Sequence, residues 1–223
     1  MALYLDSASI DDARGSAALG FVAGITTNPT LMAATGMSPD DVIPALVDAH
    51  PGLVFYQPVA RTVEDREAEA RSIVRLRPGR IGVKLASTPD NFALARRLAA
   101  DGIAVGMTAV YSAAQTWLAC QTGARFVLPY VNRASRLLGD GPALVREMRA
   151  AIDATGARVE ILAASIKTPG EAMESVRAGA HCLTIPLPLI LELGRHELSE
   201  QAIADFDAAV RGTPADHAGR EAS

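Results

Sequence analysis

Hydrophobic and polar positions follow one another in a repeating order along this chain. Short runs of aliphatic and β-branched residues alternate with longer amphipathic stretches, and each such pair occupies about 20 to 30 residues. The short runs are typical of buried strands, and the longer ones are typical of helices that cover a sheet. The pattern predicts strands at 2–5, 21–25, 53–57, 80–85, 103–107, 125–130, 159–164 and 181–185.

Residues that favour helix ends support the helices predicted between these strands. Several of the helices begin with a hydroxyl residue followed by proline, at Ser38-Pro39, Thr88-Pro89 and Thr168-Pro169. Such a hydroxyl caps the first turn, and proline is preorganised for the first helical position. Glycine, which readily adopts the conformation that ends a helix, follows several of them, at Gly20, Gly102, Gly123, Gly156 and Gly179.

Eight strands that alternate with helices predict a parallel sheet, and for 223 residues its natural closure is a compact (β/α)₈ barrel. An open doubly wound sheet is the alternative, but it rarely needs eight strands. No linker divides residues 1–198, which we assign to one barrel domain. Residues 199–211 are predicted to form an additional helix that packs on the barrel or on a neighbouring subunit. The polar residues 212–223 are predicted to be a flexible tail.

Composition narrows the classes of partner. Hydrophobic residues make up 49% of the chain and aromatic residues only 4%, which predicts an aliphatic, Ala-rich core. A net charge of −4 with interspersed signs argues against nucleic acid or an anionic membrane as partner. No run is long enough to span a membrane, and the N-terminus lacks the pattern of a secretion signal. Cys120 and Cys182 have no metal or disulfide spacing, so we expect free thiols in a cytoplasmic protein.

Lysine is rare enough to be informative. Of the 21 basic residues, only Lys84 and Lys167 are lysines. Lys84 lies within the apolar run "IGVKLAST" (81–88), where desolvation would lower its pKa and make the neutral amine available. A neutral amine that faces a pocket attacks carbonyl groups and forms a Schiff base. The alternative is a lysine at a strand end that extends its amine to water.

Polar side chains of different types stand at the carboxyl ends of the predicted strands, where barrels carry their chemistry. The candidates are Asp6, Thr27, Asn28, Gln57, Lys84, Thr108, Tyr130, Asn132, Arg133, Ser165 and Lys167. Any one of them alone is typical of a turn. Together, one acid, one isolated amine, several neutral donors and a guanidinium would line a single pocket. Asp6 is a candidate for proton transfer, together with a water held by neutral side chains.

A phosphate site is predicted next to this pocket. Arg133 follows the sixth strand, and Ser165 and Lys167 follow the seventh, just before the helix that opens at Thr168. Helix N-termini and arginine side chains both bind phosphate. For Thr168 alone, a simple helix cap is the alternative. No cluster of His, Cys and carboxylate residues has the spacing of a metal site, so we predict neither a metal nor a cofactor.

Seven ordered motifs then give the chain a resemblance. They are "LYLDSA" (3–8), "GITTNPT" (24–30), "FYQPVA" (55–60), "IGVKLAST" (81–88), "GMTAVYSAAQ" (106–115), "PYVNR" (129–133) and "LAASIKTPGEA" (162–172). Over nearly its whole length the chain resembles the small transaldolase family, near its fructose-6-phosphate aldolase branch. The resemblance implies a (β/α)₈ barrel, a class I enzyme that acts on sugar phosphates without a cofactor, and a homo-oligomer of five or ten subunits.

The resemblance also implies roles for individual residues. Lys84 matches the Schiff-base lysine, and Asp6 matches the acid that transfers protons. The substrate-binding positions are Thr27, Asn28, Arg133, Ser165 and Lys167. Of these, Asn28 would contact the dihydroxyacetone unit, and Arg133 and Ser165 would bind phosphate. The residues that would hold the catalytic water are Gln57, Thr108 and Tyr130.

Two positions favour the aldolase branch and two depart from the family. True transaldolases tend to carry Glu and Phe where this chain has Gln57 and Tyr130. Ala86 stands where the family usually has Pro, which frees a backbone φ beside the lysine, and Thr30 replaces the commoner Ser. We expect cleavage of a ketose phosphate such as fructose 6-phosphate with release of dihydroxyacetone.

Two alternatives to this reaction remain. The first is transfer of the dihydroxyacetone unit to an aldose phosphate, as in a true transaldolase of primary metabolism or of a specialised pathway. The second is a non-catalytic barrel that only binds sugar phosphates. The joint presence of Lys84 and Asp6 speaks against the second, because a binding protein needs neither of them.

Overall fold

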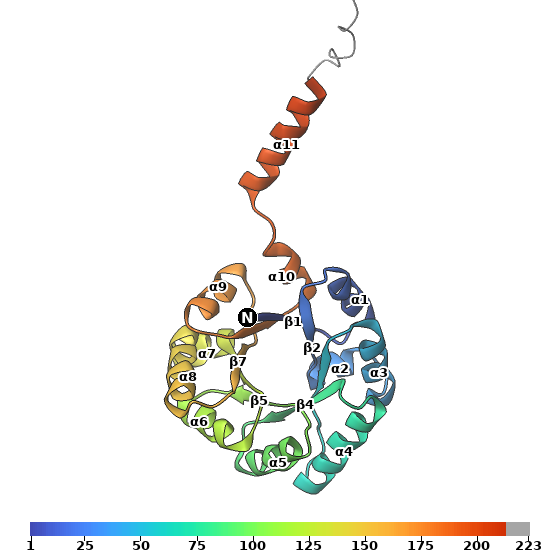
Figure 1. The fold of residues 1–223 in the computed structure, drawn as a ribbon, viewed down its shortest axis with the longest axis vertical. Coiled ribbons are helices and arrows are strands. Elements are labelled where there is room, and N and C mark those ends of the chain that lie inside the picture. The colour runs from blue at the N-terminus through green and yellow to red at the C-terminus, as the bar shows by residue number, and fades with distance from the viewer. Residues whose placement is uncertain (213–223) are drawn as a thin grey trace, which may run out of the picture. The chain divides into compact units, whose positions relative to one another are not determined.

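Within residues 1–212, which the computed structural model describes, the chain forms a closed barrel of eight parallel strands in sequential order (Figure 1). The strands are β1 (Ala2–Asp6), β2 (Val22–Thr26), β3 (Leu53–Tyr56), β4 (Ile81–Ala86), β5 (Val105–Val110), β6 (Phe126–Pro129), β7 (Glu160–Ala163) and β8 (Cys182–Ile185). Each predicted strand overlaps an observed one. The prediction of a (β/α)₈ barrel is confirmed, and the open doubly wound sheet is wrong.

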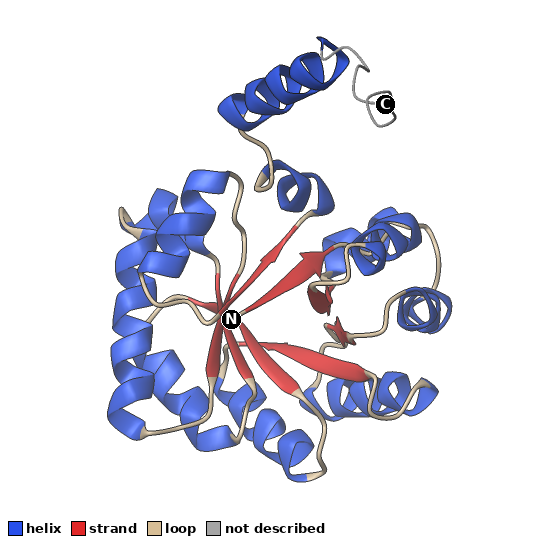
Figure 2. Ribbon diagram, turned by 45° about the horizontal axis from the view of Figure 1, so that its top comes forward, coloured by secondary structure: helices blue, strands red, loops and turns tan. Residues whose placement is uncertain are grey.

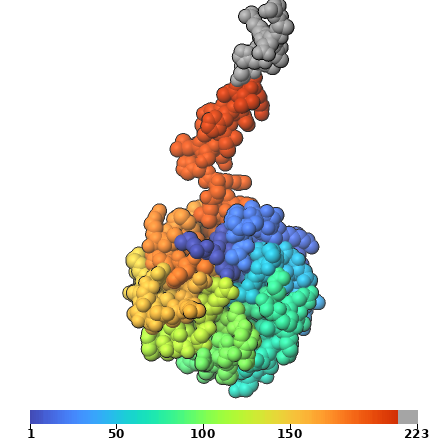
Figure 3. All heavy atoms as spheres, viewed as in Figure 1, coloured from blue at the N-terminus to red at the C-terminus, as the bar shows by residue number. Residues whose placement is uncertain are grey.

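Helices surround the strands on the outside (Figure 2). They are α1 (Ile10–Ala18), α2 (Pro29–Ala34), α3 (Pro39–Ala49), α4 (Val63–Leu76), α5 (Pro89–Ala100), α6 (Ala113–Thr122), α7 (Val131–Leu138), α8 (Gly141–Thr155), α9 (Pro169–Arg177) and α10 (Leu187–Glu192). The space-filling view follows the chain around the barrel in sequence order, so that successive units are neighbours (Figure 3). Short loops and one handedness of connection produce this order.

The predicted capping bonds are confirmed at two of the three hydroxyl–proline pairs. The hydroxyl of Ser38 accepts a hydrogen bond from Asp41 N, and that of Thr168 accepts one from Glu171 N. At Thr88, the first position of α5 is held by a backbone bond from Phe92 N, and the threonine side chain makes no capping bond. Thr88 is still the N-cap residue of α5 as predicted, and only the expected bond from its hydroxyl is absent.

The barrel interior has a lower layer, toward the amino ends of the strands, and an upper layer at their carboxyl ends. A hydrophobic cluster fills the lower layer. Its buried members are Tyr4, Phe55, Phe126, Leu128, Leu162 and Cys182. The ring of Phe126 packs edge to face against Tyr4 and Phe55, with ring centroids 5.6 Å apart in both pairs. Gly82 makes room for this packing, because a Cβ there would lie 2.5 Å from the Phe55 ring. The rest of the described core is mostly aliphatic and alanine, as predicted, and Tyr56 and Phe92 are its other buried aromatic residues.

The barrel unit runs from Met1 to Ile190, and the residues from Leu191 onward form a second compact unit. This second unit contains α11 (Glu197–Gly212), which confirms a helix where residues 199–211 were predicted to form one. Its packing on the barrel or on a neighbouring subunit stays a prediction. Of the predicted tail 212–223, all but Gly212 lies outside the described residues. Among residues 1–212, no helix combines the length and apolar character needed to cross a membrane.

Candidate active site

Lys84 is buried at the centre of the upper barrel interior. Side chains alternate along β4, so Gly82, Lys84 and Ala86 share its inner face. The Lys84 side chain is only 3% exposed, and its Nζ donates a hydrogen bond of 2.6 Å to the carbonyl oxygen of Thr27. The alternative of an amine that extends to water is therefore wrong.

The environment of Lys84 favours the neutral form of its amine. Burial lowers the pKa of Lys84 to about 8, and the negative charge of Asp6 offsets part of this effect. Such a pKa leaves roughly one amine in ten neutral at pH 7, compared with fewer than one in a thousand for an exposed lysine. The apolar strand that the sequence dictates thus produces the reactive form of the amine.

Asp6 ends β1, which β2 and β3 separate from β4, and it belongs to a buried chain of hydroxyl groups. Its Oδ1 accepts a 3.0 Å hydrogen bond from Thr26 Oγ1, which lies 2.7 Å from Thr184 Oγ1. Burial raises the pKa of Asp6, while the positive charge of Lys84, the bond from Thr26 and the charge of Lys167 oppose the rise. Asp6 therefore holds a proton more readily than an exposed carboxyl does, as a group that transfers protons requires.

Sequence reasoning missed Thr26 and Thr184. Both are fully or almost fully buried and face the barrel interior, Thr26 as the last residue of β2 and Thr184 as the second-last residue of β8. The signal was present in the alternation of the strands, because Thr26 lies directly opposite Asp6 in the β1–β2 register. Thr26 directly follows the predicted strand 21–25, where Thr27 is the sequence candidate instead, and Thr184 lies inside the predicted strand 181–185.

Two of the three residues predicted to hold a water lie together. Thr108 is fully buried on β5, and its hydroxyl donates to the hydroxyl of Tyr130 at 3.1 Å. Thr108 pairs with Ala86 in the β4–β5 register, and Tyr130 forms a bridge to Ala164 just beyond β6. The ring of Tyr111 packs edge to face against Tyr130, with centroids 6.1 Å apart. This pair of hydroxyls lies on the β5–β6 side of Lys84.

Gln57 follows β3 on the opposite side of β4. Its side-chain oxygen is buried and has no hydrogen-bond partner among the described residues. A buried acceptor without a donor costs about 1–3 kcal/mol, so such a group is typical of a site that receives a donor from outside the protein. Together with Ala86, Gln57 also lines a cavity of about 310 Å³.

The structure places Thr27 and Asn28 at the site, but each has a local task. The hydroxyl of Thr27 donates to the carbonyl of Phe55 at 2.8 Å, so Thr27 contributes its backbone carbonyl to Lys84 and not its side chain. Asn28 caps α2, where its Oδ1 accepts from Leu31 N at 3.0 Å. The assignment of both as substrate-binding residues stays a prediction.

The predicted phosphate site lies where the loops after β6 and β7 meet. The exposed guanidinium of Arg133 lies 5.0 Å from the centre of the Tyr130 ring. The carbonyl of Ser165 accepts from Asn132 N at 3.1 Å, which joins the two loops. Ser165 has a φ of +59°, a left-handed conformation that non-glycine residues rarely adopt and that is often found at functional sites.

Glu171, in the first turn of α9, joins the loops after β6 and β7. Its carboxylate accepts a 2.6 Å bond from Asn132 Nδ2 and a 2.7 Å bond from the backbone N–H of Lys167. The side chain of Lys167 is exposed, and its charge acts on Asp6. Arg133, Ser165 and Lys167 are thus on adjoining loops, as an anion site on this face of the barrel requires.

The two cysteines lie outside the candidate active site. Cys120 is half-buried and Cys182 is buried, and both are free thiols as predicted. Within the described part of the chain, no three His, Cys, Asp or Glu side chains are grouped so that they could hold a metal ion.

The two comparisons by sequence agree on the family. The model of the family described as Transaldolase/Fructose-6-phosphate aldolase matches residues 3–218. A curated relative, the "Probable transaldolase" of Symbiobacterium thermophilum, is 34% identical over 206 residues, which cover 92% of this chain and 95% of the relative. A solved mandelate oxidase variant with an FMN adduct has a TM-score of 0.59 and 15% identity, over 80% of this chain and 59% of that one. This last likeness concerns the fold alone.

Proposed function

Since the chain belongs to the transaldolase/fructose-6-phosphate aldolase family and is an enzyme of the class I aldolase/transaldolase type, we propose that it breaks and forms the C–C bond of a ketose phosphate such as fructose 6-phosphate. A dihydroxyacetone unit on Lys84 carries the reaction. One observation supports this above the others: the amine of Lys84 is buried, its pKa is lowered to about 8, and the carboxyl of Asp6 acts on it.

In the proposed reaction the neutral amine of Lys84 attacks the ketone carbon, and the loss of water gives an iminium. The bond to be broken joins the carbon next to the iminium carbon to a carbon that carries a hydroxyl group. When a base removes the proton of that hydroxyl, this C–C bond breaks. Its electron pair moves into the iminium, which becomes an enamine, and the phosphorylated aldehyde leaves. Asp6, whose pKa is raised by burial, and a water between Gln57 and the Thr108–Tyr130 pair are the proton-transfer groups.

The fate of the enamine separates the two reactions of the family. Protonation and hydrolysis release dihydroxyacetone, and attack on an aldose phosphate transfers it. We propose that release dominates, because Gln57 and Tyr130 offer a neutral amide and a hydroxyl to the water where true transaldolases tend to have a carboxylate and an apolar ring. Transfer is the alternative function, and the name of the relative from Symbiobacterium thermophilum, "Probable transaldolase", favours it.

Reduction with borohydride tests the covalent step. Reduction of an iminium leaves the sugar unit bound to its lysine as a stable secondary amine, whereas reduction of the free ketone leaves no adduct. Treatment with dihydroxyacetone or fructose 6-phosphate should therefore produce an adduct that peptide mapping places on Lys84. An adduct on Lys167, or no adduct in an enzyme that turns over, would contradict the proposal. Chelators should leave the reaction rate unchanged, because the proposed mechanism uses no metal.

Acceptor-free turnover tests the choice between release and transfer. We expect dihydroxyacetone to accumulate from fructose 6-phosphate when no aldose phosphate is added. The double substitution Gln57→Glu with Tyr130→Phe should shift the balance toward transfer, since it changes the basicity and hydrogen bonding of the water. If cleavage by the wild-type enzyme depends strictly on an added aldose phosphate, the protein is a transaldolase instead.

We also propose that the enzyme is a homo-oligomer in which α11 contacts another copy. The large apolar side chains of α11 support this, since those of Leu198, Ile203, Phe206 and Val210 are between 59% and 77% exposed. Light scattering coupled to size exclusion should show a smaller assembly for Phe206→Glu than for the wild type. The control is Asp207→Asn on the same helix. Identical masses for Phe206→Glu and wild type would count against α11 as the contact.

A further inference from the structure

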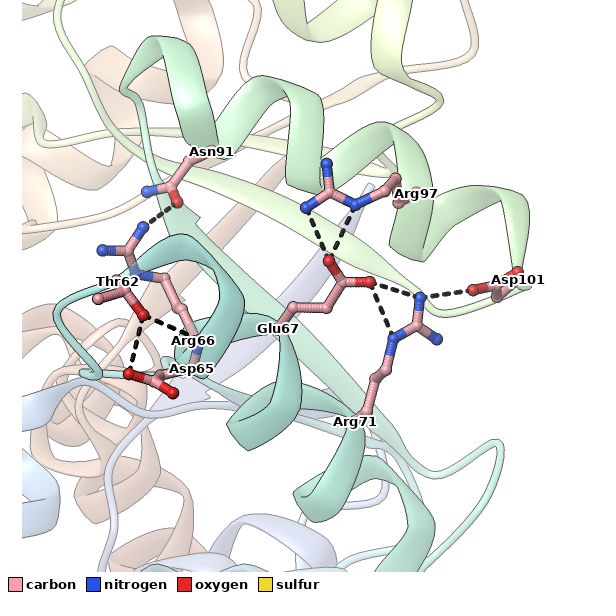
Figure 4. Close-up of polar contacts among 8 residues, drawn as sticks. All are labelled: Thr62, Asp65, Arg66, Glu67, Arg71, Asn91, Arg97 and Asp101. Carbon is pink, nitrogen blue, oxygen red and sulfur yellow. Dashed lines mark hydrogen bonds and ion pairs between the residues drawn. The ribbon is translucent and has the colours of Figure 1, made fainter.

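The strand ends that carry Gln57 and Lys84 are joined by side chains from the two helices that follow them. Figure 4 shows these contacts between α4 and α5. The guanidinium of Arg66, in the first turn of α4, donates from Nε to the carbonyl of Ala60 at 3.1 Å and from Nη2 to that of Arg61 at 3.0 Å. Arg66 thus fixes the loop that begins directly after Gln57.

Arg66 also reaches across to α5. Its Nη1 donates a 2.6 Å hydrogen bond to Oδ1 of Asn91, which is only 4% exposed. The Nδ2 of Asn91 in turn donates at 2.8 Å to the carbonyl of Ala86, the last residue of β4. One buried amide therefore connects the guanidinium on α4 with the strand end two residues beyond Lys84.

The loop after Gln57 is held to α4 by a second side chain as well. The carboxylate of Glu69 accepts from the hydroxyl of Tyr56 at 2.5 Å, from Val59 N at 3.0 Å and from Ala60 N at 2.8 Å. Glu69 satisfies the N–H groups of the loop, and Arg66 satisfies its carbonyls. The loop therefore moves with α4, and the contact to α5 passes through Arg66 and Asn91.

The ladder between β3 and β4 ends at the pair of Tyr56 and Val83, before Gln57 and Lys84. The cavity of about 310 Å³ lies between the two strand ends and is lined by Gln57, Ala86, Arg66 and Asn91, among others.

Ala86 lacks the fixed φ that a proline would impose, and the side chain of Thr88 does not cap α5. The next residue of this turn is held to β5 and α6, since Ser87 Oγ donates to the carbonyl of Thr108 at 3.0 Å and Gln115 Nε2 donates to the carbonyl of Ser87 at 3.4 Å. The bond from Asn91 is the side-chain contact that ties Ala86 itself to α5.

We propose that Arg66 and Asn91 are positioning residues, which set the end of β4 relative to the end of β3 and thereby align Lys84 with Gln57. This inference rests on the proposed function of Lys84. Displacement of a reacting group by about 1 Å can lower a rate on the order of 100-fold, so a contact of this kind acts on turnover more than on substrate binding.

A second set of contacts between the same helices provides the control. Glu67 on α4 accepts from Arg97 on α5 at 2.7 Å and pairs with Arg71 at 2.8 Å, and Arg71 reaches Asp101 at 2.7 Å (Figure 4). These ion pairs also join α4 to α5, but they involve no backbone group of β3, β4 or the loops that follow them. Their side chains are partly exposed, with Arg97 at 47%.

The sharpest variant is Asn91→Asp. An aspartate keeps an acceptor for Arg66, so the link between the helices persists, but it cannot donate to the carbonyl of Ala86. We expect kcat to fall on the order of 10- to 100-fold with KM changed less than about threefold, and the rate of borohydride trapping on Lys84 to fall with kcat. The melting temperature should stay close to that of the wild type.

Arg66→Met and the control Arg97→Met complete the experiment. Arg66→Met should lower kcat like Asn91→Asp, and the double variant should be no slower than the slower single one, because both act through one contact. Arg97→Met should leave kcat unchanged. Wild-type kcat and trapping rate in Asn91→Asp would overturn the inference, as would a loss of stability without a loss of kcat. A wild-type adduct that maps to a residue other than Lys84 would overturn the proposed function, and this inference with it.

Discussion

The lower and upper layers of the barrel interior are built on the same strands, yet they have opposite properties. On β1, Tyr4 in the hydrophobic cluster lies two positions before Asp6 in the site. The same step of two positions leads from Phe55 on β3 to Gln57. On β4 the step leads from Gly82, which makes room for Phe55, to Lys84. Because side chains return to the same face after two residues, one step along each strand changes the layer.

This difference suggests a division of roles, in which the lower layer stabilises the fold and the upper layer holds the groups of the candidate site. The lower layer is filled by rings in edge-to-face contact. The upper layer contains a buried amine with a lowered pKa, a carboxyl with a raised pKa and an amide oxygen without a partner among the described residues. The lower layer keeps water away from the base of the site, and this exclusion shifts both pKa values.

Replacement of Lys84 should separate the layers most clearly. We expect Lys84→Met to reduce cleavage of fructose 6-phosphate to the background rate, because no other amine lies at this position. The free energy of unfolding should stay the same or rise, since the lowered pKa shows that burial of the charged amine opposes folding. Activity assays and urea titrations check the two effects. The control is Lys167→Met, which should still form the adduct on Lys84.

The lower layer should show the reverse behaviour. Phe126→Ala removes a ring that contacts both Tyr4 and Phe55, so we expect the free energy of unfolding to fall by about 3–5 kcal/mol. Activity per folded molecule should change little at low temperature. Phe21, which is 64% exposed, is the matched control, and Phe21→Ala should stay within about 0.5 kcal/mol of the wild type. An inactive but stable Phe126→Ala would contradict this division of roles.

The phosphate site at the rim should affect only charged substrates. Arg133→Ala should weaken fructose 6-phosphate by about 1.5–3 kcal/mol in kcat/KM, through the loss of a charge-assisted contact. Exchange reactions of unphosphorylated dihydroxyacetone should be little affected. Arg146→Ala on α8, whose arginine pairs with Asp140 at the surface, removes the same charge elsewhere and is the control. Equal losses for both substrates would mean that Arg133 supports the barrel mouth instead.

The smallest expected effect concerns the hydroxyl chain below Asp6. In the wild type, kcat/KM should rise about tenfold per pH unit below pH 8 and level off above it, as Lys84 loses its proton. Thr26→Val removes a bond that lowers the pKa of Asp6, so that pKa should rise further.

The pH profile of the Thr26→Val variant reports this shift. Any pH limb that belongs to Asp6 should move toward higher pH, with kcat reduced several-fold at most. Thr122→Val removes a buried hydroxyl that donates to Ala119, away from the site, and its pH profile should match the wild type. A Thr26→Val profile that also matches the wild type would mean that Asp6 does not titrate in the reaction.

The sequence by itself determined the barrel and the burial of Lys84. Strand and helix periodicity are local patterns, and each of the eight predicted strands overlaps an observed one in the described residues. The burial of Lys84 was also predictable, because the apolar run 81–85 places its own neighbours around it. The resemblance then identified the family, which the comparisons confirm.

Only the tertiary structure decided how the polar groups are paired. Thr26 and Thr184 are 158 positions apart in the chain, and Arg66 and Asn91 are 25 apart, so no local pattern indicates their contacts. The tertiary structure also turned the hydroxyl of Thr27 away from the site and left the side chain of Thr88 without a capping bond. Hydrogen bonds depend on distances of a few tenths of an ångström between elements, and these are set only when the strands close into a barrel.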